Sequence, residues 1–559
     1  MRSGNYVDDN SIYHSENELE SNAGAFTSTS NARRQPEDSD DHNSAAESPA
    51  DQPEEEKKKR DTPDIDYGEG QGEDLEVGPL ELEKMQSRKS VRDPNLVTWD
   101  SPEDPANPKN WSVNRKWAAA AIVSAFTFIS PLSSSAIAPA ISTIAQDFDI
   151  SNRVQSQLTL SIFVVGYAIG PLLLGPLSEV YGRVPVLQLA NLFFLCWNIG
   201  CSFAQNTAQL IAFRFLSGLG GSAPLAIGGG VLSDCWKSEE RGKSLALYSL
   251  APLLGPAVGP IAGGFITQNT SWRWTFHAIT ITDAIIQLVG LFLLQETYGP
   301  KLLKNKADRL RKETGNVNLH TEFESPDRTL IKLLATSFQR PFRMLATQPI
   351  IQLLALYMAY IYGLMYLVLT TYPVLWADTY HESMGIGGLN YISLGLGFFF
   401  GAQIGGRLND RIYRKLKKRN NNETRPEYRA PAMVPGAILV PIGLFWYGWS
   451  AQANVHWIMP NIGACLFAAG SIFGFQCIMS YLVDAYTRYA ASAIGSATVL
   501  RSLCGFGFPL FAPYMYEALG NGWGNSLLGF ISIALGIPGP FVLWKYGQKL
   551  REKSKFAAG

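Results

Sequence analysis

Long apolar stretches separated by polar connections dominate the chain from Lys116 onward. Each stretch is about twenty residues long, which is the length that an α-helix needs to cross the hydrocarbon core of a bilayer. We identify twelve, with approximate spans 118–140, 156–177, 186–205, 209–233, 243–266, 274–294, 349–374, 389–408, 431–450, 456–481, 490–516 and 525–545. Because lipid offers the backbone no hydrogen-bond partner, each stretch is predicted to be a helix. The pattern predicts an all-α membrane protein with twelve transmembrane helices.

Basic residues are concentrated in alternate connections. The connection 296–348 contains ten Lys and Arg, the connection 406–430 contains nine, and five more follow Leu543. In the connections on the other side of the predicted membrane, Arg153 and Arg273 are the only basic residues. Basic loops favour the cytoplasmic side of a membrane. We therefore predict that both termini and the 296–348 connection are cytoplasmic, in the cell membrane or, alternatively, the vacuolar membrane.

The long connection after the sixth helix divides the apolar region into two six-helix halves. These are residues 116–295 and 349–546, joined by a cytoplasmic loop over 296–348 and followed by a short cytoplasmic tail over 547–559. After the second helix comes Gly175-Pro-Leu-Ser-Glu179-Val-Tyr-Gly182-Arg183, and after the eighth comes Gly406-Arg-Leu-Asn-Asp410-Arg411, which lacks the Gly-Arg pair. A repeat of this kind is typical of secondary transporters, which bind substrate between two moving halves.

Residues 1–100 have a different composition from the rest. They contain 25 Asp and Glu against 11 Lys and Arg, a net charge of −14, which leaves +13 for the remainder because the whole chain has −1. They are rich in Ser, Asn and acidic residues and show no hydrophobic period, so they cannot bury enough apolar surface to fold. We predict a disordered, acidic, cytoplasmic tail.

A stripe of small residues marks the predicted outer end of the fifth helix. It consists of Gly255, Pro256, Gly259, Pro260, Gly263 and Gly264. Glycines four residues apart let two membrane helices pack backbone to backbone. The eighth helix carries Gly397, Gly401 and Gly405 at the same spacing. We predict that the two stripes pack against each other; the alternative is that these are merely permissive small residues.

These motifs together resemble those of the fungal major facilitator superfamily, in its drug:proton antiporter branch with twelve helices. The resemblance covers roughly residues 100–555. It is carried by the segment Gly175–Arg183, by Arg214-Phe-Leu-Ser-Gly-Leu-Gly-Gly221, by the stripe Gly255–Gly264, and by the phrases Asp104-Pro-Ala-Asn-Pro-Lys-Asn-Trp111, Trp272-Arg-Trp274, Glu296-Thr-Tyr298 and Pro426-Glu-Tyr-Arg429. The resemblance implies a proton-coupled exporter.

Ionisable residues within the apolar spans are candidates for function, because a charge inside a bilayer needs a partner or a wet cavity. Arg214 lies in the fourth helix, and the resemblance implies a part in proton coupling for it. The alternative is an arginine that snorkels to the interface. Asp283 lies near the middle of the sixth helix, where desolvation would let it take up and release protons. The alternative is a structural acid hydrogen-bonded to a neighbouring helix.

Charged and small residues gather at the predicted cytoplasmic ends of the helices. The candidate gate residues are Gly175, Glu179, Gly182, Arg183, Asp234, Arg241, Asp410 and Asp484. An acid–base bridge there could hold an inner gate in one state and break in the other. The alternative is that these residues cap helix ends or set topology.

Aromatic residues on helices seven and ten are candidates for the substrate cavity. We select Tyr362, Tyr366, Phe475, Gln476 and Tyr481. An aromatic wall with few fixed charges favours a lipophilic compound. For any one of these residues, packing between helices or against lipid is the alternative.

We therefore predict an efflux transporter for a drug, fungicide or fungal metabolite, and no enzyme. No nucleotide-binding Gly-x-x-x-x-Gly-Lys-Ser/Thr sequence is present, so the proton gradient, and no cofactor or metal, is the expected driving force. The expected partners are a small lipophilic molecule, protons and the bilayer, with no nucleic acid, for a monomer. The alternatives are an uptake facilitator for a nutrient or polyamine, and a membrane sensor that transports nothing.

Overall fold

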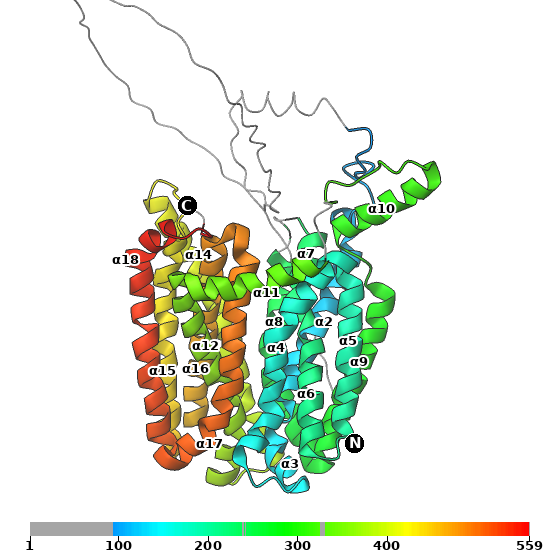
Figure 1. Cartoon of the computed structure of the whole chain (residues 1–559). Helices are drawn as coiled ribbons and strands as arrows, with labels where there is room; N and C mark the ends of the chain where they lie inside the picture. Colours follow the sequence, from blue (N-terminus) through cyan, green and yellow to red (C-terminus); the bar gives the residue numbers. More distant parts are fainter. Residues whose placement is uncertain (1–92, 238–239, 241, 325–329, 558–559) are drawn as a thin grey trace, which may run out of the picture. The chain divides into compact units, whose positions relative to one another are not determined.

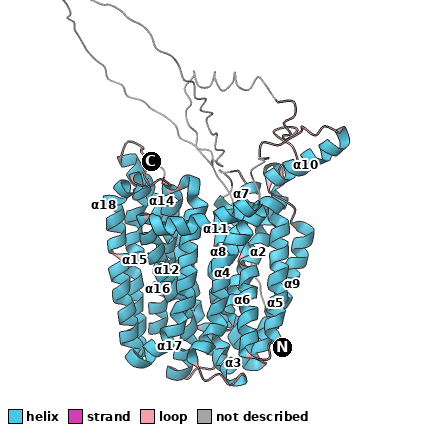
Figure 2. Cartoon of the chain, in the orientation of Figure 1, coloured by secondary structure: helices cyan, strands magenta, loops and turns pink. Residues whose placement is uncertain are grey.

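The computed structural model describes residues 93–557, apart from 238–239, 241 and 325–329. Within these residues the chain is built from helices and their connections (Figure 2), and the one extended pairing is an isolated bridge between Leu96 and His320. Eleven helical stretches are long and apolar enough to cross a membrane. The last of them, Thr487–Glu552, contains two crossings, because the chain turns back at Gly520, whose φ is 69° and ψ 177°. The prediction of twelve crossings is confirmed.

The first half contains six crossings. Its helices are α2 (Val113–Ala136), α3 (Ile141–Asp147), α4 (Arg153–Tyr181), α5 (Arg183–Ser202), α6 (Thr207–Gly221), α7 (Ala223–Cys235), α8 (Gly242–Asn269) and α9 (Trp272–Leu293). The pair α6 and α7 forms the fourth crossing. Pro252, Pro256 and Pro260 lie within α8, which nevertheless runs without interruption from Gly242 to Asn269.

The second half repeats this plan. Its helices are α12 (Pro349–Val374), α13 (Met384–Leu389), α14 (Tyr391–Arg419), α15 (Ala430–Gln452), α16 (Ile458–Ala485), α17 (Ala490–Gly536) and α18 (Pro538–Glu552). Short helical turns complete the two halves. Those at Pro108–Asn110 and Ala138–Ala140 belong to the first half or precede it, and those at Leu375–Thr379, Pro426–Arg429 and Thr487–Tyr489 belong to the second. In both halves the first crossing packs on the fifth, the second on the fourth and the third on the sixth. The repeat in the sequence is thus a repeat in the packing.

The halves, α2–α9 and α12–α18, stand side by side in Figure 1 and meet along three pairs of helices. These pairs are α4 with α17 and α8 with α13 and α14. We call the end of the bundle that carries Arg183, Arg429 and α11 the basic end, and the end that carries Arg153 and Gly520 the opposite end. The basic loops predict that the basic end faces the cytoplasm.

The connection between the halves contains two helices, α10 (Gly299–Thr314) and α11 (Leu330–Thr347). Helix α11 lies across the basic end and packs on both α4 and α17 (Figure 1). The hydroxyl of Ser496, near the start of α17, donates a hydrogen bond of 2.8 Å to the carbonyl of Pro341 in α11. The segment predicted as a loop therefore includes a helical strap that contacts both halves.

The prediction of disorder over residues 1–100 is wrong for residues 93–100; residues 1–92 lie outside the described part. The N–H of Val97 donates to the carbonyl of His320 at 2.8 Å, and His320 in turn donates to Asn95 at 2.9 Å. The sequence around Asp104 then forms a tight turn, in which the N–H groups of Asp100 and Ala106 lower the pKa of the Asp104 carboxyl below its ordinary value. The partner residue, His320, lies more than 200 residues away in the sequence, so no local hydrophobic period could show this order.

Candidate functional site

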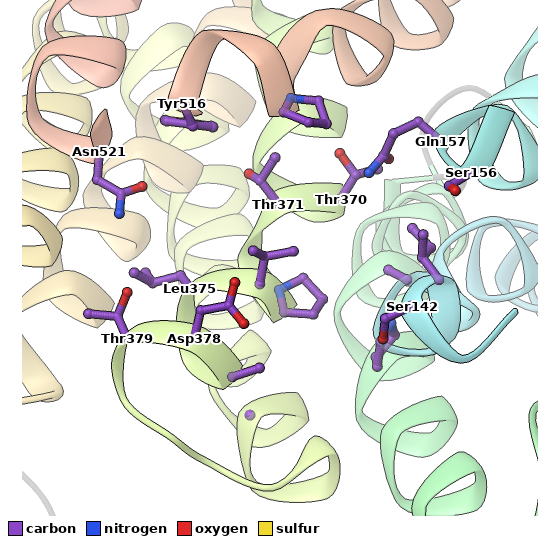
Figure 3. Close-up of a pocket in the computed structure, with 18 of the residues that line it drawn as sticks. Ser142, Ser156, Gln157, Thr370, Thr371, Leu375, Asp378, Thr379, Tyr516 and Asn521 are labelled. Carbon is purple, nitrogen blue, oxygen red and sulfur yellow. The ribbon is translucent and has the colours of Figure 1, made fainter. Parts of the chain in front are cut away.

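A cavity of about 770 Å³ lies between the two halves at the opposite end, and we call it the vestibule (Figure 3). The first half contributes Ser142 and Gln157 to its wall, and the second contributes Thr370 and Tyr516. Exposed acidic residues, Asp378 and Glu517, lie at its rim. The wall thus combines polar and apolar side chains, and both halves build it.

An ion pair and one further carboxyl group lie in the wall of the vestibule. Arg153 of α4 forms an ion pair with Glu517 of α17, and so joins the halves across the rim. Both side chains are exposed, so this pair contributes at most about 1 kcal/mol. Glu382 lies in the connection before α13, where burial raises the pKa of its carboxyl although a hydrogen bond from Asn390 opposes the shift.

A second, smaller cavity of about 160 Å³ lies deeper, and we call it the central cavity. The two cavities are neighbours along α12. Tyr366 lines the central cavity, and Thr370, one helical turn later, lines the vestibule. The central cavity is lined by Pro131, Tyr167, Leu225, Pro252, Leu253, Pro256, Ile361, Tyr362, Met365, Tyr366, Phe398, Ser471, Ile472, Phe475 and Arg501. It is apolar and aromatic, with residues from both halves and a small number of polar groups, as small-molecule sites commonly are.

The structure places three of the five predicted cavity residues on this wall, namely Tyr362, Tyr366 and Phe475. The prediction needs correction for Gln476 and Tyr481. Gln476 is rotated by about 100° from Phe475 around the helix and points toward Gly405 of α14. Tyr481 is fully buried in the core of the second half at the basic end, beside Gly547.

The sequence analysis missed Arg501, which lines the central cavity from α17. Its guanidinium carbon lies 5.0 Å from the ring centre of Tyr362 and 5.1 Å from that of Phe475. Its Nε is buried and has no hydrogen-bond partner among the described residues. The signal was present in the sequence, since a lone arginine inside an apolar span is a candidate for function.

Arg214 is fully buried, with an exposed fraction of 0%. Its Nη1 and Nη2 donate to the carbonyls of Ser133 and Ser134 at 3.0 Å each, and its Nε donates to the carbonyl of Thr159 at 3.3 Å. Ser133 and Ser134 lie in the last turn of α2, whose carbonyls have no partner within the helix and carry its negative dipole end. The snorkelling alternative for Arg214 is therefore wrong.

Arg214 is linked to the wall of the central cavity. The hydroxyl of Ser134 lies 3.2 Å from that of Tyr366, and the ring centres of Tyr366 and Tyr362 are 5.0 Å apart. Tyr362 in turn lies against Arg501. A continuous series of contacts thus joins the buried Arg214 to the half-buried Arg501.

Asp283 is fully buried between α5 and α9. Its two carboxylate oxygens accept hydrogen bonds from Nδ2 of Asn191 at 3.1 and 3.2 Å, and the same amide lies 2.8 Å from Oε1 of Gln287. Asp283 lines neither the vestibule nor the central cavity. This geometry favours the structural alternative over the proton carrier, and the choice remains to be tested.

Replacing Asp283 with asparagine tests the two alternatives. We expect the variant to keep the pH dependence of transport, because its Oδ1 can still accept from Asn191. Asp283→Leu removes that acceptor and should lower the melting temperature of the purified protein, since the N–H of Asn191 that is not bonded to Gln287 loses its acceptor, and a buried N–H without an acceptor costs about 1–3 kcal/mol. A flattened pH profile in Asp283→Asn, measured in proteoliposomes, would instead support Asp283 as the proton carrier.

At the basic end of the first half, Arg183 bridges α5 and α7. Its Nε lies 3.4 Å from Oδ2 of Asp234, and its Nη1 donates to the hydroxyl of Ser178 at 2.9 Å. The backbone N–H groups of Arg183 and Val184 donate to the carboxylate of Glu296 at 3.0 and 3.2 Å. Among the other candidate gate residues, Glu179 lies in the last turn of α4, and Arg241 lies outside the described residues.

The second half has an equivalent bridge that the sequence analysis missed. Nε of Arg429 donates to Asp484 at 2.8 Å, and its Nη1 donates to Asp410 at 3.0 Å. Arg183 and Arg429 both lie at the start of the third crossing of their half, so aligning the halves by helix order would have found Arg429. Both bridges join helices of the same half, whereas the predicted gate needs a bridge that opens and closes between states. The contacts between halves at this end are those of α4, α17 and α11.

Gly182 provides a stability prediction. Its φ is 106° and ψ 155°, and an added Cβ would lie 2.3 Å from Oε2 of Glu296. We expect Gly182→Ala to destabilise the purified protein by about 1–3 kcal/mol, because this backbone region is accessible almost only to glycine. Gly175→Ala, in the same motif, is the matched control, since an added Cβ there meets nothing within 4 Å. Equal melting temperatures of the two variants would contradict the expectation.

The two glycine stripes do not pack against each other, so that prediction is wrong. Added Cβ atoms at Gly255, Gly259 and Gly263 would meet the backbone of α2 at 2.8, 2.5 and 1.9 Å. Those at Gly397 and Gly401 would meet backbone atoms of α16 at 2.4 and 2.5 Å, and that at Gly405 would meet Phe473 of α16 at 3.0 Å. Each stripe joins two helices of its own half, because the spacing defines a face but not its partner.

Helix α8 does meet α13 and α14 between the halves, through Gly264 and Pro260 at the end of its stripe and through Ala257. An added Cβ at Gly264 would lie 2.7 Å from the carbonyl oxygen of Met384, and one at Gly388 would lie 3.1 Å from that of Pro260. Further along, an added Cβ at Gly395 would lie 2.9 Å from Cβ of Ala257. The contact between halves is therefore close here as well.

Twelve crossings in two repeated halves, with a cavity between them near the middle, define a secondary-transporter architecture. The sequence matches the Major Facilitator Superfamily over residues 123–509. The chain therefore belongs to the Major Facilitator Superfamily and is a multi-pass membrane protein.

Relatives with curated names match along most of the chain. "Efflux pump vrtL" of Penicillium aethiopicum is 52% identical over 493 residues, which is 88% of this chain and 97% of the relative. "MFS-type transporter penM" of Penicillium rubens is 43% identical over 502 residues, 89% of this chain and 98% of the relative. "Efflux pump radE" of Floropilus chiversii is 43% identical over 493 residues, 87% and 90% of the two chains.

Solved structures share the fold at low identity. The xylose transporter XylE from E. coli, in a partially occluded inward open conformation, has a TM-score of 0.57 and 16% identity, over 78% of this chain and 98% of that one. A bacterial homologue of the human lysosomal transporter Spinster, inward-facing and unoccupied, has a TM-score of 0.55 and 15% identity, over 79% and 94% of the two chains. At such identities the likeness concerns the fold alone.

Proposed function

We propose that the chain is an efflux transporter, which exports a small organic molecule from the cytoplasm in exchange for protons by alternating access. The observation that carries the proposal is the central cavity, which both halves line and which aromatic residues dominate. Two of the relatives bear the name "efflux pump", which agrees with export. The fold provides two halves that can rock about this cavity.

The arrangement of the two cavities corresponds to one state of such a cycle. The vestibule leads toward the central cavity from the opposite end, while α4, α17 and α11 pack together at the basic end. With the basic end in the cytoplasm, this is an outward-facing state. Substrate would reach the central cavity from the cytoplasm when these contacts at the basic end separate.

Arg214 is our candidate for coupling the proton to this cycle. Its acceptors are main-chain carbonyls in α2 and α4, and Ser134 joins it to Tyr366 at the cavity wall. A change in the hydration or protonation of this region would therefore alter contacts of α2, α4 and α12 at the same time. Coupling requires that proton and substrate each bind the two states unequally.

Transport in proteoliposomes tests the function. The full-length chain is reconstituted, a pH gradient is imposed, and movement of three naphthalene probes is measured: 2-naphthoate, its methyl ester and 2-naphthylmethylammonium. We expect transport of at least one probe against the direction of proton flow, and loss of accumulation when an ionophore collapses the gradient. Accumulation in the direction of proton flow would indicate uptake instead, and unchanged accumulation without the gradient would remove proton coupling.

A deletion variant separates the transporter from a sensor. Removal of residues 1–95 should leave probe transport intact, because both cavities are lined by residues beyond this segment. A full-length chain that moves none of the probes, yet loses a cellular response when residues 1–95 are removed, would favour the sensor.

A further inference from the structure

The central cavity contains a fixed positive charge. Of the residues that line it in the described part of the chain, Arg501 alone carries a formal charge at neutral pH. No carboxylate of these residues lies within 4.0 Å of its guanidinium. Arg501 is half-buried, and its Nε is buried. A charge partly withdrawn from water without a partner is unfavourable. A site that retains such a charge is suited to a ligand of opposite charge.

The position of the guanidinium supports this function. Tyr362 and Phe475 lie 5.0 and 5.1 Å from its carbon and hold it through cation–π contacts. Such contacts leave the N–H groups at the edge of the guanidinium free to donate. This planar fork matches a carboxylate, which it can bind through two parallel hydrogen bonds. Nε itself has no acceptor among the described residues.

The remainder of the wall indicates the rest of the ligand. Leu225, Ile361, Met365 and Ile472 are apolar, and the hydroxyls of Tyr167 and Ser471 add a few polar groups. An apolar or aromatic body would lie against these side chains while its anionic group reaches Arg501. We infer that the central cavity binds an apolar organic acid, a carboxylate or an acidic phenol, with its anion on the guanidinium of Arg501.

This inference rests on the proposed function and narrows its substrate class. It narrows the expected lipophilic compound to an acid, and it argues against a polyamine, because Arg501 would repel a polycation and none of the described residues that line the central cavity is a carboxylate. Arg214 differs from Arg501, since each of its three nitrogens already donates to a main-chain carbonyl. Arg501 is thus the arginine that is available to a ligand.

Binding of charge-matched probes to the purified full-length protein tests the inference. We expect 2-naphthoate to bind at least tenfold more tightly than its methyl ester, a difference of about 1.4 kcal/mol, and 2-naphthylmethylammonium to bind most weakly. Arg501→Gln should abolish the preference for the acid while leaving affinity for the ester within about twofold. Arg501→Lys should keep part of the preference. Arg488→Gln, in the turn before α17 and outside the cavity, is the matched control and should behave as the unsubstituted protein does.

The outcomes distinguish this inference from the proposed function. Equal binding of acid and ester by the unsubstituted protein would overturn the inference, and this comparison needs no variant that must fold. A preference for the acid that persists in Arg501→Gln would overturn it as well. Tight, Arg501-dependent binding of 2-naphthoate without transport would support the anion site while contradicting the exporter.

Discussion

Replacing Arg214 with alanine should reduce transport at least a hundredfold. The substitution leaves the carbonyls of Ser133, Ser134 and Thr159 buried without their donor, and each such loss costs about 1–3 kcal/mol. It also removes the link between α2 and α4 behind the cavity wall. The measurement is the initial rate of probe transport in proteoliposomes, normalised to the amount of folded protein.

Two further variants make this result specific. Arg214→Lys keeps the charge but cannot reproduce the planar, three-carbonyl geometry, so we expect it to restore little activity. Arg153→Ala removes an exposed arginine whose ion pair with Glu517 contributes little, and it should retain more than half of the activity. A merely mild loss in Arg214→Ala would show that the buried hydrogen bonds are not required for transport.

Replacing Gly263 with alanine should reduce transport more than tenfold. Its added Cβ would lie 1.9 Å from the carbonyl oxygen of Ala136, so α2 and α8 must separate. Overpacking of this kind costs about 1–3 kcal/mol. Since Ser133 and Ser134 lie one turn away on α2, the separation would also displace the acceptors of Arg214.

The matched control for this variant is Gly229→Ala in α7, where an added Cβ meets nothing within 4 Å. We expect it to transport as the unsubstituted chain does, at the same level of protein in the membrane. Normal transport by Gly263→Ala would contradict the packing argument. A loss shared equally by both variants would indicate a general effect of replacing glycine in these helices.

The helices could be predicted from the sequence because hydrocarbon thickness and backbone hydrogen bonding leave few choices. The partners of the helices could not. The spacing of Gly255, Gly259 and Gly263 identified a face for close packing, yet α2, which receives that face, carries no matching glycine stripe. Which helix neighbours which is decided by the assembly of the whole half.

The candidate site was predictable where residue type alone is informative. Tyr362, Tyr366 and Phe475 were selected as aromatic residues on inner helices, and they line the central cavity. Gln476 was selected with Phe475 although the two point in different directions around α16. Arg501 could have been identified as an ionisable residue within the apolar span 490–516. Arg429 could have been identified from its position, which corresponds to that of Arg183 in the first half.

The vestibule has a practical consequence for inhibition. If the basic end is cytoplasmic and the protein lies in the cell membrane, this space of about 770 Å³ faces the surrounding medium. A compound shaped to its wall could then hold the halves apart at this end without entering the cell. Such a blocker would act from outside and would not need to accumulate in the cytoplasm. Export by the transporter could therefore not lower the concentration of the blocker at the vestibule.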